Sequence, residues 1–158
     1  QRTCDSTVVA GVCAAAIAHH QVICLLVSLL SKARTPLEIR QFMMSKSIEC
    51  TKDHPVSTEE MTTMMDHHLP NTKASNCFIA CIFKKFGWMT EKGMYDLNAA
   101  NLFAEDEYKD DATQIENAKK VFDACKGVND ESPADGEAGC DRANSLAKCL
   151  LEHGPKMG

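Results

Sequence analysis

Nine cysteines among 158 residues could form disulfide bonds or bind a metal ion. Three lie in an apolar N-terminal stretch, and six follow it with the spacing C-x26-C-x3-C-x43-C-x14-C-x8-C. An even number in the body of the chain predicts three disulfides. The Cys-x3-Cys interval also suits zinc, but the apolar leader indicates an oxidising compartment and therefore favours disulfides. The six cysteines are Cys50, Cys77, Cys81, Cys125, Cys140 and Cys149.

The spacing limits which cysteines can pair. Cys77 and Cys81 are four residues apart in a predicted helix, so they share a face and need partners on other elements. Cys140 and Cys149 are nine residues apart, about 900° of helical rotation, so they face nearly opposite directions. Six cysteines allow 15 pairings in total, and the spacing alone leaves several of them open.

Other chemistry is poorly supported by the sequence. Beyond residue 33 the histidines are His54, His67, His68 and His153, and none lies in a catalytic or metal-binding motif. Adjacent helical residues such as His67 and His68 diverge by about 100° and rarely chelate together. The acidic loop 130–137 lacks the alternating ligands of an EF-hand. The sequence therefore predicts no enzyme, no metal site and no cofactor.

The N-terminal stretch predicts a signal peptide. An apolar run at 22–30 precedes Ser31-Lys32-Ala33, which suits cleavage before Arg34. The rival interpretation, a membrane anchor reaching back to Val8, is weakened by the polar interruption at residues 19–21. We expect residues 1–33 to be a signal peptide, those before about Ala18 being additional upstream sequence. Residues 34–158 then form one domain, and a net charge of −5 argues against nucleic-acid binding.

Capping residues, prolines and glycines divide the domain into about six short helices, without strand alternation. Thr35-Pro36 begins the first helix, and Ser57 with Glu60 forms a capping box for the second. The fold class predicted is all-α. The expected helices run from residue 36 to Cys50, from Ser57 to about Leu69, from Lys73 to Phe86, from Leu97 to Phe103, from Asp110 or Asp111 to Cys125, and from Cys140 to His153.

The three- and eight-residue cysteine intervals closely resemble the six-cysteine signature of insect odorant-binding proteins. The setting is similar too, with a signal peptide before an acidic, helical domain, and the resemblance covers residues 34–158. Plant lipid-transfer proteins, by contrast, use an adjacent cysteine pair that this chain lacks. Members of the odorant-binding family pair the first cysteine with the third, the second with the fifth and the fourth with the sixth. The resemblance thus implies Cys50–Cys81, Cys77–Cys140 and Cys125–Cys149.

The resemblance also implies a function. Six helices held by three interlocking disulfides would surround a hydrophobic cavity. The protein would be an extracellular carrier in sensillum lymph or another body fluid, solubilising odorants, pheromones, or fatty alcohols, acids and esters. Delivery to a membrane odorant receptor is a further expectation, and a homodimer is compatible with the sequence. The alternative is a secreted interaction scaffold on the same disulfide frame with a filled core.

The residues expected to contact a ligand are apolar and lie on or beside the helices. Eight methionines suit a pocket that accepts varied ligands. Trp88, which follows the end of the third helix, is a leading candidate, and His153 near the end of the last helix is a candidate pH switch, because a helix C-terminus favours positive charge. The predicted ligand contacts are Phe42, Met43, Met61, Met65, Phe78, Ile82, Phe83, Phe86, Trp88, Met89, Met94, Tyr95, Phe122 and Leu146.

Overall fold

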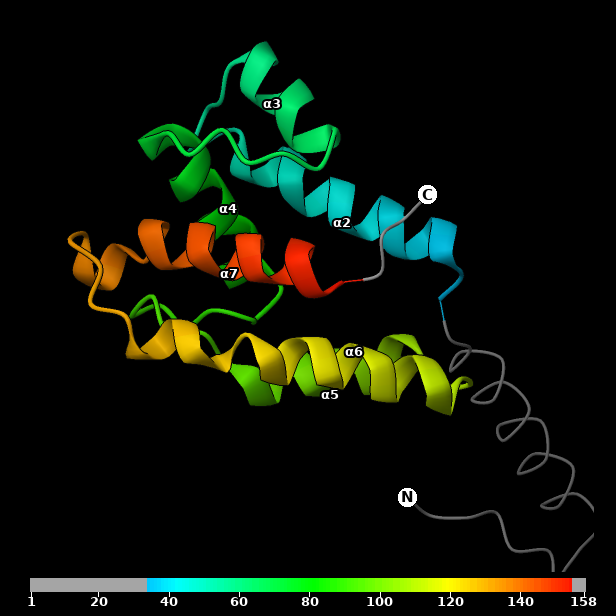
Figure 1. Cartoon of the computed structure of the whole chain (residues 1–158). Helices are drawn as coiled ribbons and strands as arrows, with labels where there is room; N and C mark the ends of the chain where they lie inside the picture. Colours follow the sequence, from blue (N-terminus) through cyan, green and yellow to red (C-terminus); the bar gives the residue numbers. More distant parts are fainter. Residues whose placement is uncertain (1–33, 155–158) are drawn as a thin grey trace, which may run out of the picture. The chain divides into compact units, whose positions relative to one another are not determined.

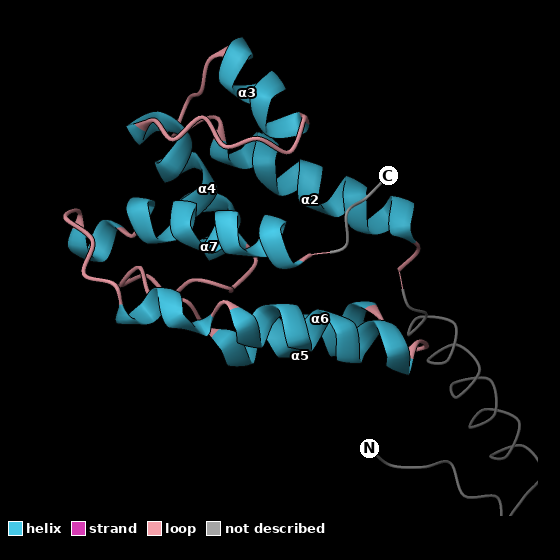
Figure 2. Cartoon of the chain, in the orientation of Figure 1, coloured by secondary structure: helices cyan, strands magenta, loops and turns pink. Residues whose placement is uncertain are grey.

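The computed structural model describes residues 34–154, and 1–33 and 155–158 lie outside the described part. The predicted signal peptide is therefore not described. The chain divides at Ala33, and the part that begins at Arg34 forms a compact unit by itself. Residues 34–154 hold six α-helices and two short 3-10 turns, without a β-sheet, as predicted (Figure 1, Figure 2). Their bounds are α2 (Pro36–Cys50), α3 (Thr58–Met65), α4 (Lys73–Lys85), α5 (Leu97–Glu107), α6 (Ala112–Ala124), η1 (Lys126–Asp130), η2 (Gly136–Ala138) and α7 (Cys140–His153).

Local hydrogen bonds set where the helices begin. The predicted capping box of α3 is present: Glu60 N donates to Ser57 Oγ at 3.1 Å, and Ser57 N donates to Glu60 Oε2 at 2.8 Å. Thr35 and Thr72 begin α2 and α4 with similar boxes. Asp111, one of two predicted caps for α6, accepts from the backbone of that helix. Each cap satisfies backbone donors that a helix N-terminus leaves free.

Two helix ends differ from the prediction. Helix α3 ends at Met65, before the predicted end at Leu69, because His67 adopts a left-handed φ of 61°. Helix α5 runs to Glu107, beyond the predicted end at Phe103. Its buried face continues to Glu107, whose side chain is hidden from solvent. A run of acidic residues resembles a solvated loop in the sequence, so this extension was missed.

The helices pack on one another in a linear order. Helix α2 packs on α4, α4 on α7, α7 on α6, and α6 on α5. In Figure 1, α7 (orange to red) lies between α2 and α4 on one side and the α5–α6 pair on the other. Consistent with this central position, α7 buries the side chain of Leu146 completely. Helix α3 is peripheral and buries no residue.

Three disulfides join these neighbours, and they are the pairs that the family resemblance implies. One ties α2 to α4, a second ties α4 to α7, and a third ties the end of α6 to α7. Helices α4 and α7 each carry two of the bonded cysteines, so they form the centre of the covalent frame. The pairs are Cys50–Cys81, Cys77–Cys140 and Cys125–Cys149.

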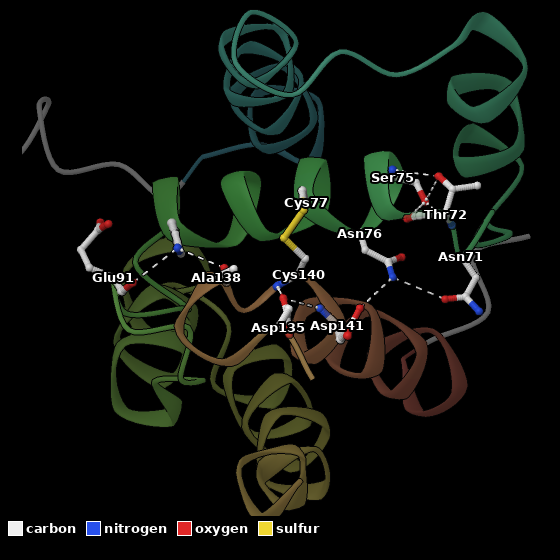
Figure 3. The surroundings of a disulfide bond; sticks show 11 residues. Asn71, Thr72, Ser75, Asn76, Cys77, Glu91, Asp135, Ala138, Cys140 and Asp141 are labelled. Atoms are coloured by element: carbon white, nitrogen blue, oxygen red, sulfur yellow. Dashed lines mark hydrogen bonds between the residues drawn. A yellow bond between two sulfur atoms is a disulfide. The ribbon is translucent and has the colours of Figure 1, made fainter. Parts of the chain in front are cut away.

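The start of α7 depends on a carboxylate and a close backbone approach. Asp135 accepts hydrogen bonds from the backbone N–H groups of Cys140 at 2.6 Å and Asp141 at 3.2 Å, and so caps the start of α7 (Figure 3). Gly139 has a left-handed φ of 71°, and a Cβ there would lie 2.6 Å from the Cα of Gly93. Both positions therefore require glycine.

Candidate functional site

Trp88 and five phenylalanine rings form a connected group, which we call the aromatic cluster. Trp88 lies in the loop after α4 with only 6% of its surface exposed. Its ring centroid is 5.2 Å from those of Phe103 and Phe122, the first on α5 and the second on α6. Such spacing is typical of favourable edge-to-face and offset contacts. The cluster consists of Phe42, Phe83, Phe86, Trp88, Phe103 and Phe122.

The cluster has an inner and an outer side. Phe83, Trp88 and Phe122 are buried, whereas Phe42 and Phe86, like Phe103, are only half-buried. Phe86 links the outer rings, with centroid distances of 5.8 Å to Phe42 and 6.2 Å to Phe103. The three outer rings therefore keep part of their surface exposed to solvent. An apolar molecule that covered these rings would gain hydrophobic free energy.

An ion pair borders the outer side of the cluster. Arg34 Nη1 donates to Glu107 Oε1, and the Arg34 guanidinium carbon also lies 4.5 Å from the centroid of the Phe42 ring. The Glu107 side chain is only 2% exposed. Burial raises the pKa of Glu107 above its usual value, and the positive charge of Arg34 lowers it only in part. Glu107 is thus a carboxylate held at the edge of an apolar core.

Two buried polar atoms at the cluster lack a hydrogen-bond partner among the described residues. One is Glu107 Oε2, the oxygen that does not face Arg34, and the other is Trp88 Nε1. Buried polar groups in folded proteins are nearly always hydrogen-bonded. An unpaired acceptor and an unpaired donor in one region are therefore a specific chemical feature of this site.

A second apolar surface lies between α2 and α3, and we call it the methionine groove. Its volume is about 640 Å³, and Met43 and Met44 on α2 face it together with the methionines of α3. Several of these side chains are well exposed, and Met65 reaches 67%. The lining residues are Arg40, Met43, Met44, Ser47, Ile48, Thr51, Met61, Met64, Met65 and His67.

The predicted ligand contacts separate into three sets. Five belong to the aromatic cluster, three line the methionine groove, and the others lie elsewhere. The cluster holds Phe42, Phe83, Phe86, Trp88 and Phe122, the groove holds Met43, Met61 and Met65, and outside both are Phe78, Ile82, Met89, Met94, Tyr95 and Leu146.

The residues outside both surfaces vary in burial. Phe78, Met89 and Leu146 are buried, Ile82 is half-buried, and Met94 is exposed. The remaining predicted ligand contact is Tyr95. Its hydroxyl donates to the Phe122 carbonyl at 3.3 Å, and burial raises the pKa of Tyr95.

His153, the predicted pH switch, is exposed in the last turn of α7. Its side chain therefore faces solvent. The role of His153 stays a prediction.

Sequence reasoning missed Phe103, Glu107 and Arg142. Arg142 is buried and donates to three backbone carbonyls, those of Val128, Gly93 and Glu131, at 2.8–3.0 Å. Its position four residues before Leu146 places it on the buried face of α7, and this spacing is visible in the sequence. Phe103 and Glu107 share a face of α5 for the same reason, but only once the helix is extended.

Two other features do not occur among the described residues. No group of three or more His, Cys, Asp or Glu side chains that could hold a metal ion occurs among residues 34–154. Within the same range, no helix has the length and apolar character needed to cross a membrane.

The all-α frame, with three disulfides around an aromatic centre, defines a small helical binding protein. Residues 32–153 match the model of the PBP/GOBP family, and the chain belongs to that family, the insect odorant-binding proteins. The family consists of carrier proteins and not of enzymes.

Individual relatives agree with this assignment. The chain is 27% identical over 110 residues to general odorant-binding protein 19d of Drosophila melanogaster, covering 70% of each chain. Its fold is similar to that of odorant-binding protein 4 from Chrysopa pallens, with a TM-score of 0.63, 20% identity, and coverage of 79% of this chain and 97% of the other. A fatty acid binding protein, OBP56a from the blowfly Phormia regina, has a TM-score of 0.54 and 23% identity, with coverage of 77% and 96%.

Proposed function

We propose that this protein carries small hydrophobic ligands whose apolar body lies on the outer side of the aromatic cluster. The observation that carries the proposal is the connected, half-buried set of Phe42, Phe86 and Phe103, of which the last two contact the buried Trp88. Four helices supply or support these rings, and one disulfide, Cys50–Cys81, holds two of them, α2 and α4, together. A covalent frame of this kind can maintain an apolar surface that a small domain would otherwise bury.

Binding on this surface would be physical and not chemical. Each buried methylene contributes about 0.8 kcal/mol. A ten-carbon chain therefore gains several kcal/mol before entropic costs, which corresponds to dissociation constants of roughly micromolar. Odorants, pheromones and fatty alcohols, acids or esters are the ligands that we expect to bind with dissociation constants in this range. The Phormia regina neighbour is named a fatty acid binding protein, so fatty acids belong in the first set of ligands tested.

We further propose that the protein is secreted after cleavage before Arg34, and that it delivers its ligand to a membrane odorant receptor. Sequencing the N-terminus of protein secreted from insect cells tests the cleavage. A first residue of Arg34 would support it. Retention of residues 1–33 in the secreted protein would refute it.

The carrier function is tested with residues 34–158, which hold the whole core and all three disulfides. A hydrophobic fluorescent probe is titrated while the emission of Trp88, the single tryptophan, is followed. We expect saturable one-to-one binding, quenching of Trp88, and displacement by fatty alcohols or acids. No saturable binding by helical, fully oxidised protein would refute the carrier function and favour the interaction scaffold.

Matched variants locate the site. Phe103→Ala removes a ring of the cluster, and we expect it to weaken probe binding about tenfold, because a large apolar contact is lost. Met65→Ala, in the methionine groove, is the control and should leave the affinity unchanged. The reverse result would place the ligand in the groove. Phe103→Leu, which keeps an apolar side chain, and a measurement of helicity by circular dichroism distinguish loss of a ligand contact from loss of folding.

A further inference from the structure

We infer that Glu107 and Trp88 form a polar subsite at the aromatic cluster that selects ligands with a hydroxyl group. The inference rests on the proposed carrier function and specifies the ligand class. Glu107 Oε2 is a buried acceptor and Trp88 Nε1 is a buried donor, and neither has a partner among residues 34–154. A hydroxyl group both donates and accepts, so it can satisfy the two atoms directly or through one water.

The two residues are neighbours of the same ring, that of Phe103. Phe103 lies 5.2 Å from Trp88 by ring centroids, and it precedes Glu107 by four residues on α5. Residues four apart share a helix face, so Glu107 and Phe103 are adjacent on the side that faces the cluster. The subsite is thus continuous with the apolar surface proposed for the ligand chain.

The charge at the subsite discriminates between head groups. Arg34 engages only Glu107 Oε1, so the second oxygen keeps its capacity to accept a hydrogen bond. A fatty carboxylate, ionised at pH 8, has no hydrogen to donate to Oε2, and it would add a second negative charge beside the Glu107–Arg34 pair. An ether or an ester offers no donor to Oε2. An alcohol is the head group that pairs with Oε2 and Nε1 together.

The experiment is a displacement titration on residues 34–158 at pH 8 with bound N-phenyl-1-naphthylamine. The competitors are 1-decanol, 1-methoxydecane and decanoate, which share a ten-carbon chain. We expect 1-decanol to bind about tenfold more tightly than 1-methoxydecane, as a hydrogen bond to a charged group predicts. Equal affinities for these two competitors would overturn the inference while leaving the carrier function intact. Failure of the probe itself to bind would instead refute the carrier function.

Variants assign the selectivity to the named residues. Glu107→Leu removes the acceptor, and it should reduce the preference for the alcohol to about onefold without weakening 1-methoxydecane. Glu105→Leu is the matched control, two residues earlier on α5, where the side chain is exposed and pairs with Lys119. It should keep the preference. An alcohol preference that survives Glu107→Leu would overturn the inference.

A second variant covers the case in which Glu107→Leu does not fold. Trp88→Phe keeps a ring and removes the donor Nε1. We expect this variant to lose most of the preference for 1-decanol while it still binds the probe. An unchanged preference in Trp88→Phe would contradict the assignment of Nε1.

Discussion

The aromatic cluster and the methionine groove are both apolar, but the chain holds them in different ways. The cluster surrounds a buried tryptophan, and its other rings come from two packed helix pairs, α2 with α4 and α5 with α6. One wall of the groove is α3, which buries no residue and carries no disulfide-bonded cysteine. The side chains that α3 contributes to the groove are mainly flexible methionines, and Met65 is mostly exposed.

This difference indicates what each surface can do. Aromatic rings fixed at centroid distances of 5–6 Å have a defined shape and can discriminate between ligands. Methionine side chains rearrange easily and accept many shapes, so a methionine surface discriminates weakly. The buried acceptor and donor at Glu107 and Trp88 also belong to the cluster, which makes it the site where selectivity is expected.

The largest expected effect comes from breaking the covalent frame. Replacing both Cys77 and Cys140 by serine removes the disulfide that closes a loop of 63 residues. We expect the free energy of unfolding to fall by about 4 kcal/mol. Removing Cys50–Cys81, with a separation of 31 residues, should cost slightly less, about 3.5 kcal/mol. Urea unfolding followed by circular dichroism measures both. If the Cys77–Cys140 variant unfolds at the wild-type urea concentration, the frame does not stabilise the core as described.

An effect of intermediate size compares how much the core and the methionine groove each contribute to stability. Leu146→Ala removes a fully buried side chain from α7, and it should lower the free energy of unfolding by about 3 kcal/mol. Met65→Ala, at an exposed position in the groove, should change it by less than about 0.5 kcal/mol. Thermal and urea unfolding provide the measurement. Similar losses in the two variants would show that the groove is packed as firmly as the core.

The subtlest effect concerns pH. Because burial raises the pKa of Glu107 above 4.5, the folded protein binds this proton more tightly than the unfolded chain does. Stability contributed by this group is therefore present at low pH and is lost as the pH rises through the raised pKa. We expect Glu107→Gln to flatten the decline of stability above pH 4.5, measured by urea unfolding across pH.

The control for the pH effect is Glu116→Gln on α6. The pKa of Glu116 is lowered by the exposed ion pair with Lys120, so this change should leave the decline in place. A slope that is the same in wild type and Glu107→Gln would contradict the assigned burial of Glu107. Arg34→Ala should raise the pKa of Glu107 further, because the lowering effect of the guanidinium is lost.

Much of the helical architecture was predictable from short stretches of sequence. Ser57 with Glu60 begins α3, Thr35 precedes α2 and Asp111 begins α6, because a cap depends on residues only three positions away. The end of α5 was not predictable in this way. It depends on the burial of Glu107 beside Arg34, which lies 73 residues away in the chain.

The candidate site was predicted only in part. The residue types in the sequence indicated apolar ligand contacts, and five of the cluster's six rings were named in advance. Their separation from the methionines of the groove was not visible, because it depends on which face of α2 meets α4 and which meets α3. Tyr95 illustrates the same limit, since its hydroxyl donates to a carbonyl 27 residues away.

The sequence by itself therefore determined the all-α class, most helix boundaries, and, through the family's cysteine signature, the three disulfide pairs. These properties follow from local backbone chemistry and from the spacing of a few cysteines. Tertiary structure alone decided which aromatic rings surround Trp88, and that Glu107 is buried against Arg34 with one oxygen unpaired. Such contacts join helices that are distant in the chain, and only the packing of those helices brings their side chains together.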